Sequence, residues 1–218
     1  MRYLSWAAFY EGPSDALYLD VLLPRLIREL IATDGLVLAD IPDSPAVRLG
    51  AKGRDVVSIA GEACKSRDAF NLVFIHADTG GRGLERDLHH RSDAYCVAMS
   101  NLCGLPRDHC VSLTPKHETE AWLLADREAV AAALGVRGRI NALGLPVDAA
   151  AAERIEDPKA VLANTIALVA GRRRGQRVDT LFPAIAQRQD FARLRRSQSF
   201  KAFEERLRSS LRVLGFIA

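Results

Sequence analysis

No stretch of the 218-residue sequence stays apolar for the 18–20 or so residues that a membrane-spanning helix needs. Low-complexity tracts and internal repeats are also absent, and Met1-Arg2 does not lead into a secretory signal. Hydrophobic residues make up 49% and charged residues 26% of the chain, a balance that does not favour disorder. We therefore expect a cytoplasmic globular protein, built as one large domain or as one domain with an appendage.

Cysteine is scarce, and none of the four forms a Cys-x-x-Cys pair. One interpretation is a zinc site made by Cys96, Cys103, His109 and Cys110. We prefer buried, reduced thiols, because the flanking residues are typical of helix and strand interiors. The motif Gly-x-x-x-x-Gly-Lys-Ser/Thr is missing as well, so we do not expect the chain itself to hydrolyse ATP.

The most informative stretch is residues 72–78, an apolar run that ends at an acid and is followed by a glycine-rich loop. This pattern predicts a buried strand, and ligands of open α/β sheets bind just beyond the carboxyl ends of such strands. Asp78 then lies at the edge where chemistry is usually done, with His76 two residues earlier on the same face. The alternative is that Asp78 only caps the loop.

The first predicted strand, residues 3–10, also ends at an acid. Its continuation is Glu11-Gly12-Pro13-Ser14-Asp15, in which Gly12 permits a tight turn and Pro13 suits the first position of a helix. Asp15 falls in the first helical turn, where an acid suits the positive end of the helix. The apolar spacing carries this helix to about residue 32. If the two strands are neighbours, Glu11 and Asp78 can share one divalent cation.

Alternating helices and strands continue along the chain, with short strands at 36–38 and 46–49, helices at 55–67 and 91–102, and a strand at 110–113. This alternation predicts a mostly parallel sheet with helices on both faces. Residues 118–134 then form one helix or two abutting helices. Glu118 and Glu120 occupy the first turn. One interpretation is that each carboxylate interacts favourably with the helix dipole and so stabilises the helix by about 0.3–1 kcal/mol. For Glu120 we favour binding of metal or water. His117 either assists the site or is an exposed turn residue.

Four motifs, taken in order, resemble the TOPRIM domain, the metal-binding α/β module of topoisomerases, primases and overcoming-lysogenisation-defect nucleases. Two of them are Glu-Gly-x-x-Asp at 11–15 and Asp78 with glycines behind it; the others are Glu-x-Trp-Leu-Leu at 120–124 and Glu-Asp-Pro-Lys at 156–159. The last two are similar to small TOPRIM-related proteins of unknown function that are often encoded beside ATPases in bacterial defence loci. The resemblance covers about residues 3–165. One departure is that His76 stands where the family has an aspartate.

The resemblance implies a metal-dependent nuclease with an ATPase partner in antiphage defence. Glu11 would be a metal ligand or general base, Asp78 the principal ligand, and Glu120 a further ligand or the residue that positions the attacking water. Oxygen ligands favour Mg²⁺, whereas His76, if it is a ligand, favours Mn²⁺.

Several cations are candidates for phosphate contacts. Lys52 and Arg54 lie in a glycine-bearing turn, and Lys159 lies in the first turn of a helix that begins after Asp157, where a cation does not suit the dipole. Residues 171–218 hold 12 Lys and Arg against 4 Asp and Glu, whereas residues 1–170 hold 18 against 23. The basic part includes Arg172, Arg173 and Arg174. Solvated surface charge is the alternative in each case.

We therefore expect a TOPRIM-like domain at residues 1–170 and a basic helical extension at 171–218. The leading function is a Mg²⁺- or Mn²⁺-dependent nuclease acting on RNA or DNA. A catalytically inactive adaptor that binds the ATPase or nucleic acid is the main alternative, and the histidine at position 76 favours it. A metal-dependent enzyme of nucleotide phosphotransfer is a further alternative. We also consider that the chain forms a homo-oligomer, and we expect no membrane partner.

Overall fold

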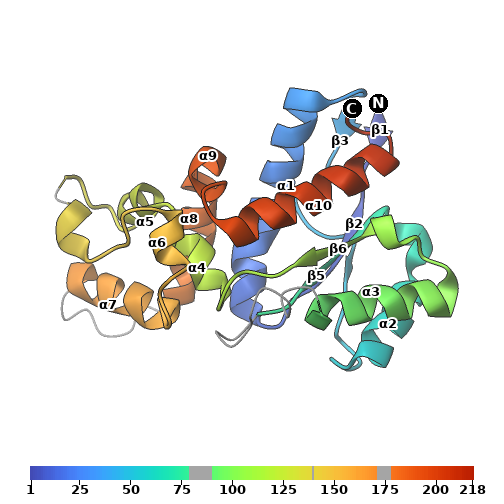
Figure 1. Cartoon of the computed structure of the whole chain (residues 1–218), viewed down its shortest axis with the longest axis horizontal. Helices are drawn as coiled ribbons and strands as arrows, with labels where there is room; N and C mark the ends of the chain where they lie inside the picture. Colours follow the sequence, from blue (N-terminus) through green and yellow to red (C-terminus); the bar gives the residue numbers. More distant parts are fainter. Residues whose placement is uncertain (79–89, 139, 171–177) are drawn as a thin grey trace.

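The computed structural model describes residues 1–78, 90–138, 140–170 and 178–218 (Figure 1). The main sheet has the strand order β4-β2-β5-β6, and each neighbouring pair is parallel; β1 and β3 form a second, two-stranded parallel sheet. The strands are β1 (Arg2–Tyr3), β2 (Trp6–Phe9), β3 (Ala39–Asp40), β4 (Val47–Arg48), β5 (Leu72–His76) and β6 (Cys110–Leu113).

Helices surround the main sheet and extend to one side of it (Figure 1). They are α1 (Pro13–Asp34), α2 (Val56–Lys65), α3 (His90–Cys103), α4 (Thr119–Leu124), α5 (Arg127–Ala133), α6 (Ala149–Ala152), α7 (Pro158–Ala170), α8 (Phe182–Arg188), α9 (Phe191–Leu194) and α10 (Gln198–Val213). Short 3-10 helices lie at Arg67–Ala69, Arg107–His109, Ile140–Leu143 and Val178–Leu181. The predicted α/β class, with a helical C-terminal part, is confirmed.

Side-chain alternation along the strands separates two hydrophobic clusters. Phe9, Val73 and the other side chains on their face of the sheet pack with α2 and α3. Trp6, Phe74 and the other side chains on the opposite face pack with α1 and α10. Successive side chains of a strand point to opposite faces, so each strand serves both layers. The predicted helices on both faces of the sheet are therefore present.

The predicted first strand, residues 3–10, is divided into β1 and β2. The break lies at Ser5, whose backbone N–H and hydroxyl both donate to Oδ1 of Asn71, at 2.9 and 3.2 Å. Its carbonyl in turn accepts from the backbone of Asn71. The predicted strand at 36–38 also differs, because the pairing with β1 falls on Ala39–Asp40 instead. Both differences come from partners distant in sequence.

A chain of aromatic rings joins the sheet to the helices beside it. Ring centroids of Trp6 and Phe74 lie 5.7 Å apart, those of Phe74 and Phe203 6.3 Å, and those of Phe203 and Trp122 5.6 Å. Trp122 also meets Phe200 edge to face at 5.1 Å. These rings belong to β2, β5, α10 and α4, so α10 packs as part of the core rather than as a separate appendage. The predicted division into a domain at residues 1–170 and an extension at residues 171–218 stays a prediction.

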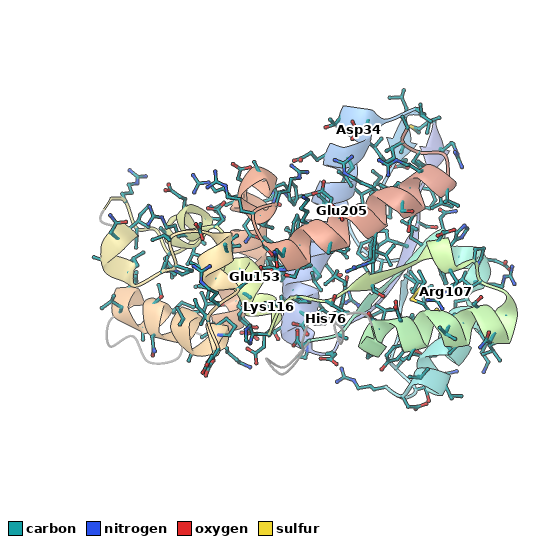
Figure 2. All side chains as sticks on the ribbon, in the orientation of Figure 1. Asp34, His76, Arg107, Lys116, Glu153 and Glu205 are labelled. Atoms are coloured by element: carbon teal, nitrogen blue, oxygen red, sulfur yellow. A yellow bond between two sulfur atoms is a disulfide. The ribbon has the colours of Figure 1, made fainter. Side chains whose placement is uncertain are left out.

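A buried carboxylate anchors the beginning of α10. Glu153 accepts hydrogen bonds from the backbone N–H and hydroxyl of Ser199, the hydroxyl of Ser197 and the backbone N–H of Gln198, at 2.5–3.0 Å. Glu153 is labelled in Figure 2. Burial alone would raise the pKa of Glu153, but these hydrogen bonds outweigh it and lower the pKa. The anion is therefore preferred in the folded protein.

The cysteines form two disulfides, so the prediction of reduced thiols and the zinc alternative are both wrong for this structure. Cys64 of α2 is bonded to Cys103 at the end of α3, and Cys96 of α3 is bonded to Cys110 of β6. The partners are 39 and 14 residues apart, and only the packing of α3 on α2 and the sheet brings them together. Paired cysteines are more typical of oxidising compartments, so the cytoplasmic location stays a prediction.

We predict that Glu153→Ala lowers the free energy of unfolding by about 3–5 kcal/mol, because four donors at the start of α10 lose their acceptor. Glu153→Gln, which keeps one acceptor oxygen, should cost less. Urea denaturation at several pH values measures both. Because the folded pKa is lowered, the stabilisation is present above the ordinary carboxyl pKa and is lost as the pH falls through the folded value. Equal stability of wild type and Glu153→Ala would contradict the anchoring role.

We predict that reduction of the disulfides destabilises the α2–α3 layer, by about 3–4 kcal/mol for each bond in the loop-entropy account. Thermal unfolding with and without dithiothreitol should show a lower Tm in the reduced sample. Mass spectrometry after alkylation of the denatured, unreduced protein should show no adducts. Four adducts at an unchanged Tm would contradict the pairing.

Candidate metal centre

His76 is the last residue of β5 and lies at the carboxyl edge of the sheet. It shares the strand face of Phe74, the face that packs against α1, and its side chain is fully buried. The first residue of α4, Thr119, places its hydroxyl 3.1 Å from Nε2 of His76. The imidazole is thus enclosed by β5, α1 and α4, which come from three separate parts of the sequence.

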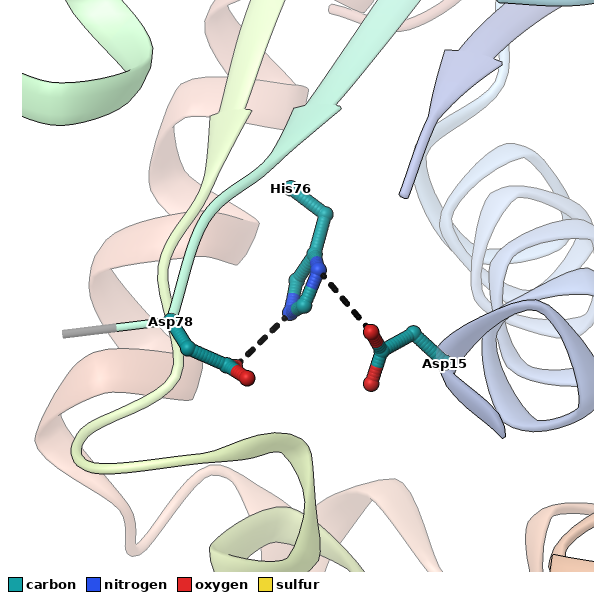
Figure 3. Close-up of side chains that lie close together, drawn as sticks. All are labelled: Asp15, His76 and Asp78. Carbon is teal, nitrogen blue, oxygen red and sulfur yellow. Dashed lines mark ion pairs between the residues drawn. The ribbon is translucent and has the colours of Figure 1, made fainter. Parts of the chain in front are cut away.

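Two aspartates flank the imidazole from opposite sides (Figure 3). Oδ1 of Asp78 lies 3.1 Å from Nε2 of His76, and Oδ2 of Asp15 lies 3.6 Å from Nδ1. One ligand atom from each of the three residues lies within 4.8 Å of the others, close enough to hold one metal ion. A site for an ion at this edge therefore fits the residues present, while the identity of the ion is a separate question.

Charges around His76 favour its protonated form. Burial lowers the pKa of the imidazole, but the hydrogen bond to Asp78 and the charges of Asp15, Asp78 and Glu11 outweigh burial and raise the pKa. Burial is the main cause that raises the pKa of Asp15, opposed chiefly by His76. Because the pKa of His76 is raised in the folded protein, its protonation stabilises the fold. This stabilisation is fully present below pH 6.5, the ordinary histidine pKa, and is lost as the pH rises through the folded pKa.

Glu11 and Asp78 lie at the ends of neighbouring strands, as expected. β2 pairs with β5 in the register Phe9 to Ile75, and Oε2 of Glu11 accepts a hydrogen bond of 3.0 Å from the backbone N–H of Asp78. The backbone N–H of Glu11 lies 3.4 Å from Nδ1 of His76. The carboxylate of Glu11 therefore braces Asp78, and the third member of the close group is Asp15 rather than Glu11.

Glu118, Glu120 and Lys159 act on one another, and on the first group, through their charges. Glu120 is 6% exposed, and burial raises its pKa to about 7, with Glu118 and Asp15 adding to the shift and Lys159 opposing it. The pKa of Glu118 is also raised, by burial and then by the charge of Asp78, again opposed by Lys159. Glu120 is thus near the centre electrostatically but outside the three-residue group.

The other cations that were predicted to contact phosphate differ in where they lie. Arg54 donates a hydrogen bond of 2.7 Å to the backbone carbonyl of Glu11, which holds it at the rim of the centre. Lys52 has an exposed side chain, and its backbone N–H donates to Glu62 at 2.7 Å. Residues 79–89, which include the glycine loop, and Arg172, Arg173 and Arg174 lie outside the described residues.

No site role was predicted for two residues of the centre, Asp15 and Thr119. Asp15 was expected to interact with the helix dipole. It does cap the turn, since its Oδ2 accepts a hydrogen bond of 2.8 Å from the backbone N–H of Gly12. The motif Glu-Gly-x-x-Asp could have indicated a site role for Asp15, because a residue in the first turn of this helix lies close to the end of the preceding strand. No local sequence pattern indicated a role for Thr119, because its contact with His76 joins residues 43 positions apart.

Comparisons with protein-family models, with curated proteins and with solved structures found no match to this chain. Among the described residues, no helix combines the length and apolar character needed to cross a membrane. The site is therefore interpreted from its own geometry, and the likeness to the TOPRIM domain stays a prediction.

We predict that Glu120→Gln stabilises the metal-free protein above neutral pH. A folded pKa of about 7 against an ordinary 4.5 means that ionisation costs the fold about 3 kcal/mol, a cost that develops between these two values. The variant avoids this cost, so its advantage should be absent below pH 4.5 and complete near pH 8. Urea denaturation in EDTA measures it, with Glu205→Gln, an exposed carboxylate of α10, as control. Parallel pH profiles for wild type and Glu120→Gln would contradict the shift.

Proposed function

We propose that this protein is a divalent-metal-dependent phosphodiesterase acting on nucleic acid, with Mg²⁺ or Mn²⁺ bound by Asp15, His76 and Asp78. The observation that carries the proposal is the close group of two carboxylates and one imidazole at the carboxyl edge of a parallel sheet. Carboxylates suit Mg²⁺ and Mn²⁺, and an imidazole ligand favours Mn²⁺ over Mg²⁺. A bound cation would polarise the scissile phosphate and stabilise the attacking and leaving oxygens.

The surrounding residues support this chemistry. Glu11 accepts a hydrogen bond from the backbone N–H of Asp78 and so holds the backbone of this ligand in place. Glu120, with a pKa of about 7, suits a general base that accepts a proton from the attacking water at neutral pH. Lys159, whose charge acts on Glu118 and Glu120, and Arg54, which donates to the carbonyl of Glu11, are cations that suit the phosphates of a polyanion.

The basic C-terminal part supports nucleic-acid binding only where its arginines are not used by the fold. Arg195 pairs with Glu29 and Glu204, both at 2.7 Å. Arg208 pairs with Asp34 and Glu204, and Nε of the partly buried Arg206 donates to the carbonyl of Ser112 at 3.0 Å. These arginines bind α10 to α1 and the sheet. Contacts by Arg172–Arg174, an ATPase partner and a homo-oligomer stay predictions.

A catalytically inactive adaptor is a second candidate, favoured by one observation. With His76 protonated, the imidazolium lies between the two aspartates and offsets one of their two negative charges without an ion. A metal would have to displace that proton, so metal affinity should rise with pH in an enzyme of the proposed kind. In an adaptor the Asp15–His76–Asp78 group would be a structural ion network.

We predict that Asp78→Asn abolishes metal-dependent cleavage and weakens Mn²⁺ binding at least about tenfold, because the amide keeps the shape but removes the charge. Calorimetric Mn²⁺ titration and cleavage of tRNA, single-stranded and duplex substrates measure the two effects. Asp68→Asn is the matched control, since Asp68 is fully exposed and precedes β5 at the other edge of the sheet. Wild-type protein that cuts no nucleic acid with either metal, alone or with an ATPase partner, would rule out the enzyme.

The variant His76→Asp separates the two candidates further. It restores a second carboxylate beside Asp78 and removes the proton that competes with the metal. An enzyme should shift its preference from Mn²⁺ toward Mg²⁺, and its metal affinity should become less dependent on pH. For an adaptor, partner binding should be unchanged.

A further inference from the structure

The loop between β4 and α2 carries Arg54 at the carboxyl edge of the main sheet. β4 and β2 are parallel neighbours, so the loop that follows β4 lies at the same edge as Glu11, which comes after β2. Two backbone N–H groups of the loop, those of Gly50 and Lys52, donate to the carboxylate of Glu62 on α2, at 2.6 and 2.7 Å. The loop is therefore held in place ahead of Arg54.

Arg54 is anchored at both its backbone and its side chain. The hydroxyl of Tyr95, on α3, donates to the backbone carbonyl of Arg54 at 3.1 Å, and the Tyr95 ring stacks on Phe9 of β2 with the centroids 5.5 Å apart. Nη1 of Arg54 donates to the backbone carbonyl of Glu11 at 2.7 Å. Arg54 is nevertheless exposed, so the other N–H donors of its guanidinium are available to a ligand.

One residue, Glu11, connects this guanidinium to the Asp15–His76–Asp78 centre. The backbone N–H of Glu11 lies 3.4 Å from Nδ1 of His76, and its carbonyl accepts the hydrogen bond from Arg54. These two lengths and the bond lengths within Glu11 place Nη1 of Arg54 at most about 10 Å from the imidazole. Successive phosphates of one strand advance only about 3.4 Å along a duplex. A strand with its scissile phosphate at the centre can therefore bring a neighbouring phosphate to Arg54.

Arg54 also differs from the arginines that the fold uses. Arg195 and Arg208 each pair with two acids, which offset their charge. Among the described residues, Arg54 pairs with no acid, and the group that holds its guanidinium is a neutral carbonyl. Its full positive charge is therefore presented in a fixed place, and the planar guanidinium suits two oxygens of one phosphate. Such preorganisation lowers the entropy that a binding residue loses when its ligand arrives.

We propose that Arg54 binds a phosphate of the substrate strand next to the scissile one, and that Tyr95 is the positioning residue that holds Arg54 for this contact. The inference deepens the proposed function and rests on it, because the strand at the centre is the substrate of the proposed enzyme. It singles out Arg54 among the candidate cations, and it adds to the site a tyrosine of α3.

Substitutions of Arg54 separate its charge from its shape. Arg54→Ala should weaken the binding of a single-stranded oligonucleotide about tenfold or more. It should also reduce the slope of log K against log salt by about 0.7, because one phosphate contact is lost. Arg54→Lys should keep the wild-type slope but not the full affinity, since an ammonium lacks the planar fork. If Arg54→Ala does not fold, Arg54→Gln replaces it, because the amide can still donate to Glu11.

Two further variants test the positioning role and the specificity of the effect. Tyr95→Phe keeps the ring that stacks on Phe9 but removes the hydroxyl, so affinity should fall about threefold at an unchanged salt slope. Arg67→Ala is the matched control. Arg67 is also exposed and donates to a backbone carbonyl, that of Cys103 at 2.7 Å, but it precedes β5 and so lies at the other edge of the sheet. Its loss should change neither affinity nor slope.

The experiment is fluorescence anisotropy of labelled single-stranded DNA and RNA with the full chain in EDTA, at several KCl concentrations, with circular dichroism for every variant. In MnCl₂, Arg54→Ala should then raise KM for cleavage about tenfold and leave kcat within about threefold, because Arg54 does not contact the scissile phosphate.

Wild-type affinity and slope in Arg54→Ala would overturn the inference, and so would an equal loss in Arg67→Ala, which would assign the effect to general surface charge. A fall in kcat at unchanged KM, or a wild type that binds no oligonucleotide, would overturn it as well. Absence of cleavage by wild type in MnCl₂ is a separate result. It would refute the enzyme, whereas the binding data in EDTA would still decide the role of Arg54.

Discussion

The packing of Trp122 against Phe200 and Phe203 is the contact on which the arrangement of the centre depends. Helix α4 has six residues, too few to be stable alone, and its position comes from this buried ring. The indole N–H donates to the Ser199 hydroxyl at 2.8 Å, which ties α4 to the start of α10. Thr119 reaches His76 from the same short helix. Loosening this core would therefore separate the acids of α4 from those of the sheet.

The Asp15–His76–Asp78 group could hold either a proton on its imidazole or a metal ion. An imidazole between two carboxylates is stabilised by protonation, and the same three groups are suitable ligands once the proton leaves. A carboxylate at position 76 would be ionised throughout the neutral range, whereas a histidine loses or gains its proton there, so its ability to bind a metal depends on pH. This difference gives the two candidate functions, enzyme and adaptor, a common physical origin.

Charge in the C-terminal part serves two purposes that composition alone cannot separate. Arginines such as Arg195 and Arg208 pair with acids of α1 and of α10 itself, so much of the local excess of positive charge stabilises the fold. Lys159 is different, since it opposes the charges of Glu118 and Glu120 at the centre. Lys159 comes from the acidic part of the chain, whereas Arg195 and Arg208 come from the basic part.

The sequence by itself determined the alternation of strands and helices, because hydrophobic period and turn residues are local properties; the strand at Cys110–Leu113 and the acids at neighbouring strand ends follow from it. Only the tertiary structure decided which groups meet. Asp15 joins His76 and Asp78 in the close group because the helix after β2 begins at the sheet edge, whereas the carboxylate of Glu11 binds the backbone of Asp78. The disulfides, absent from the prediction, join residues that only helix packing brings together. Such contacts span tens of residues, and their partners are set by the packing of whole layers, which no local pattern encodes.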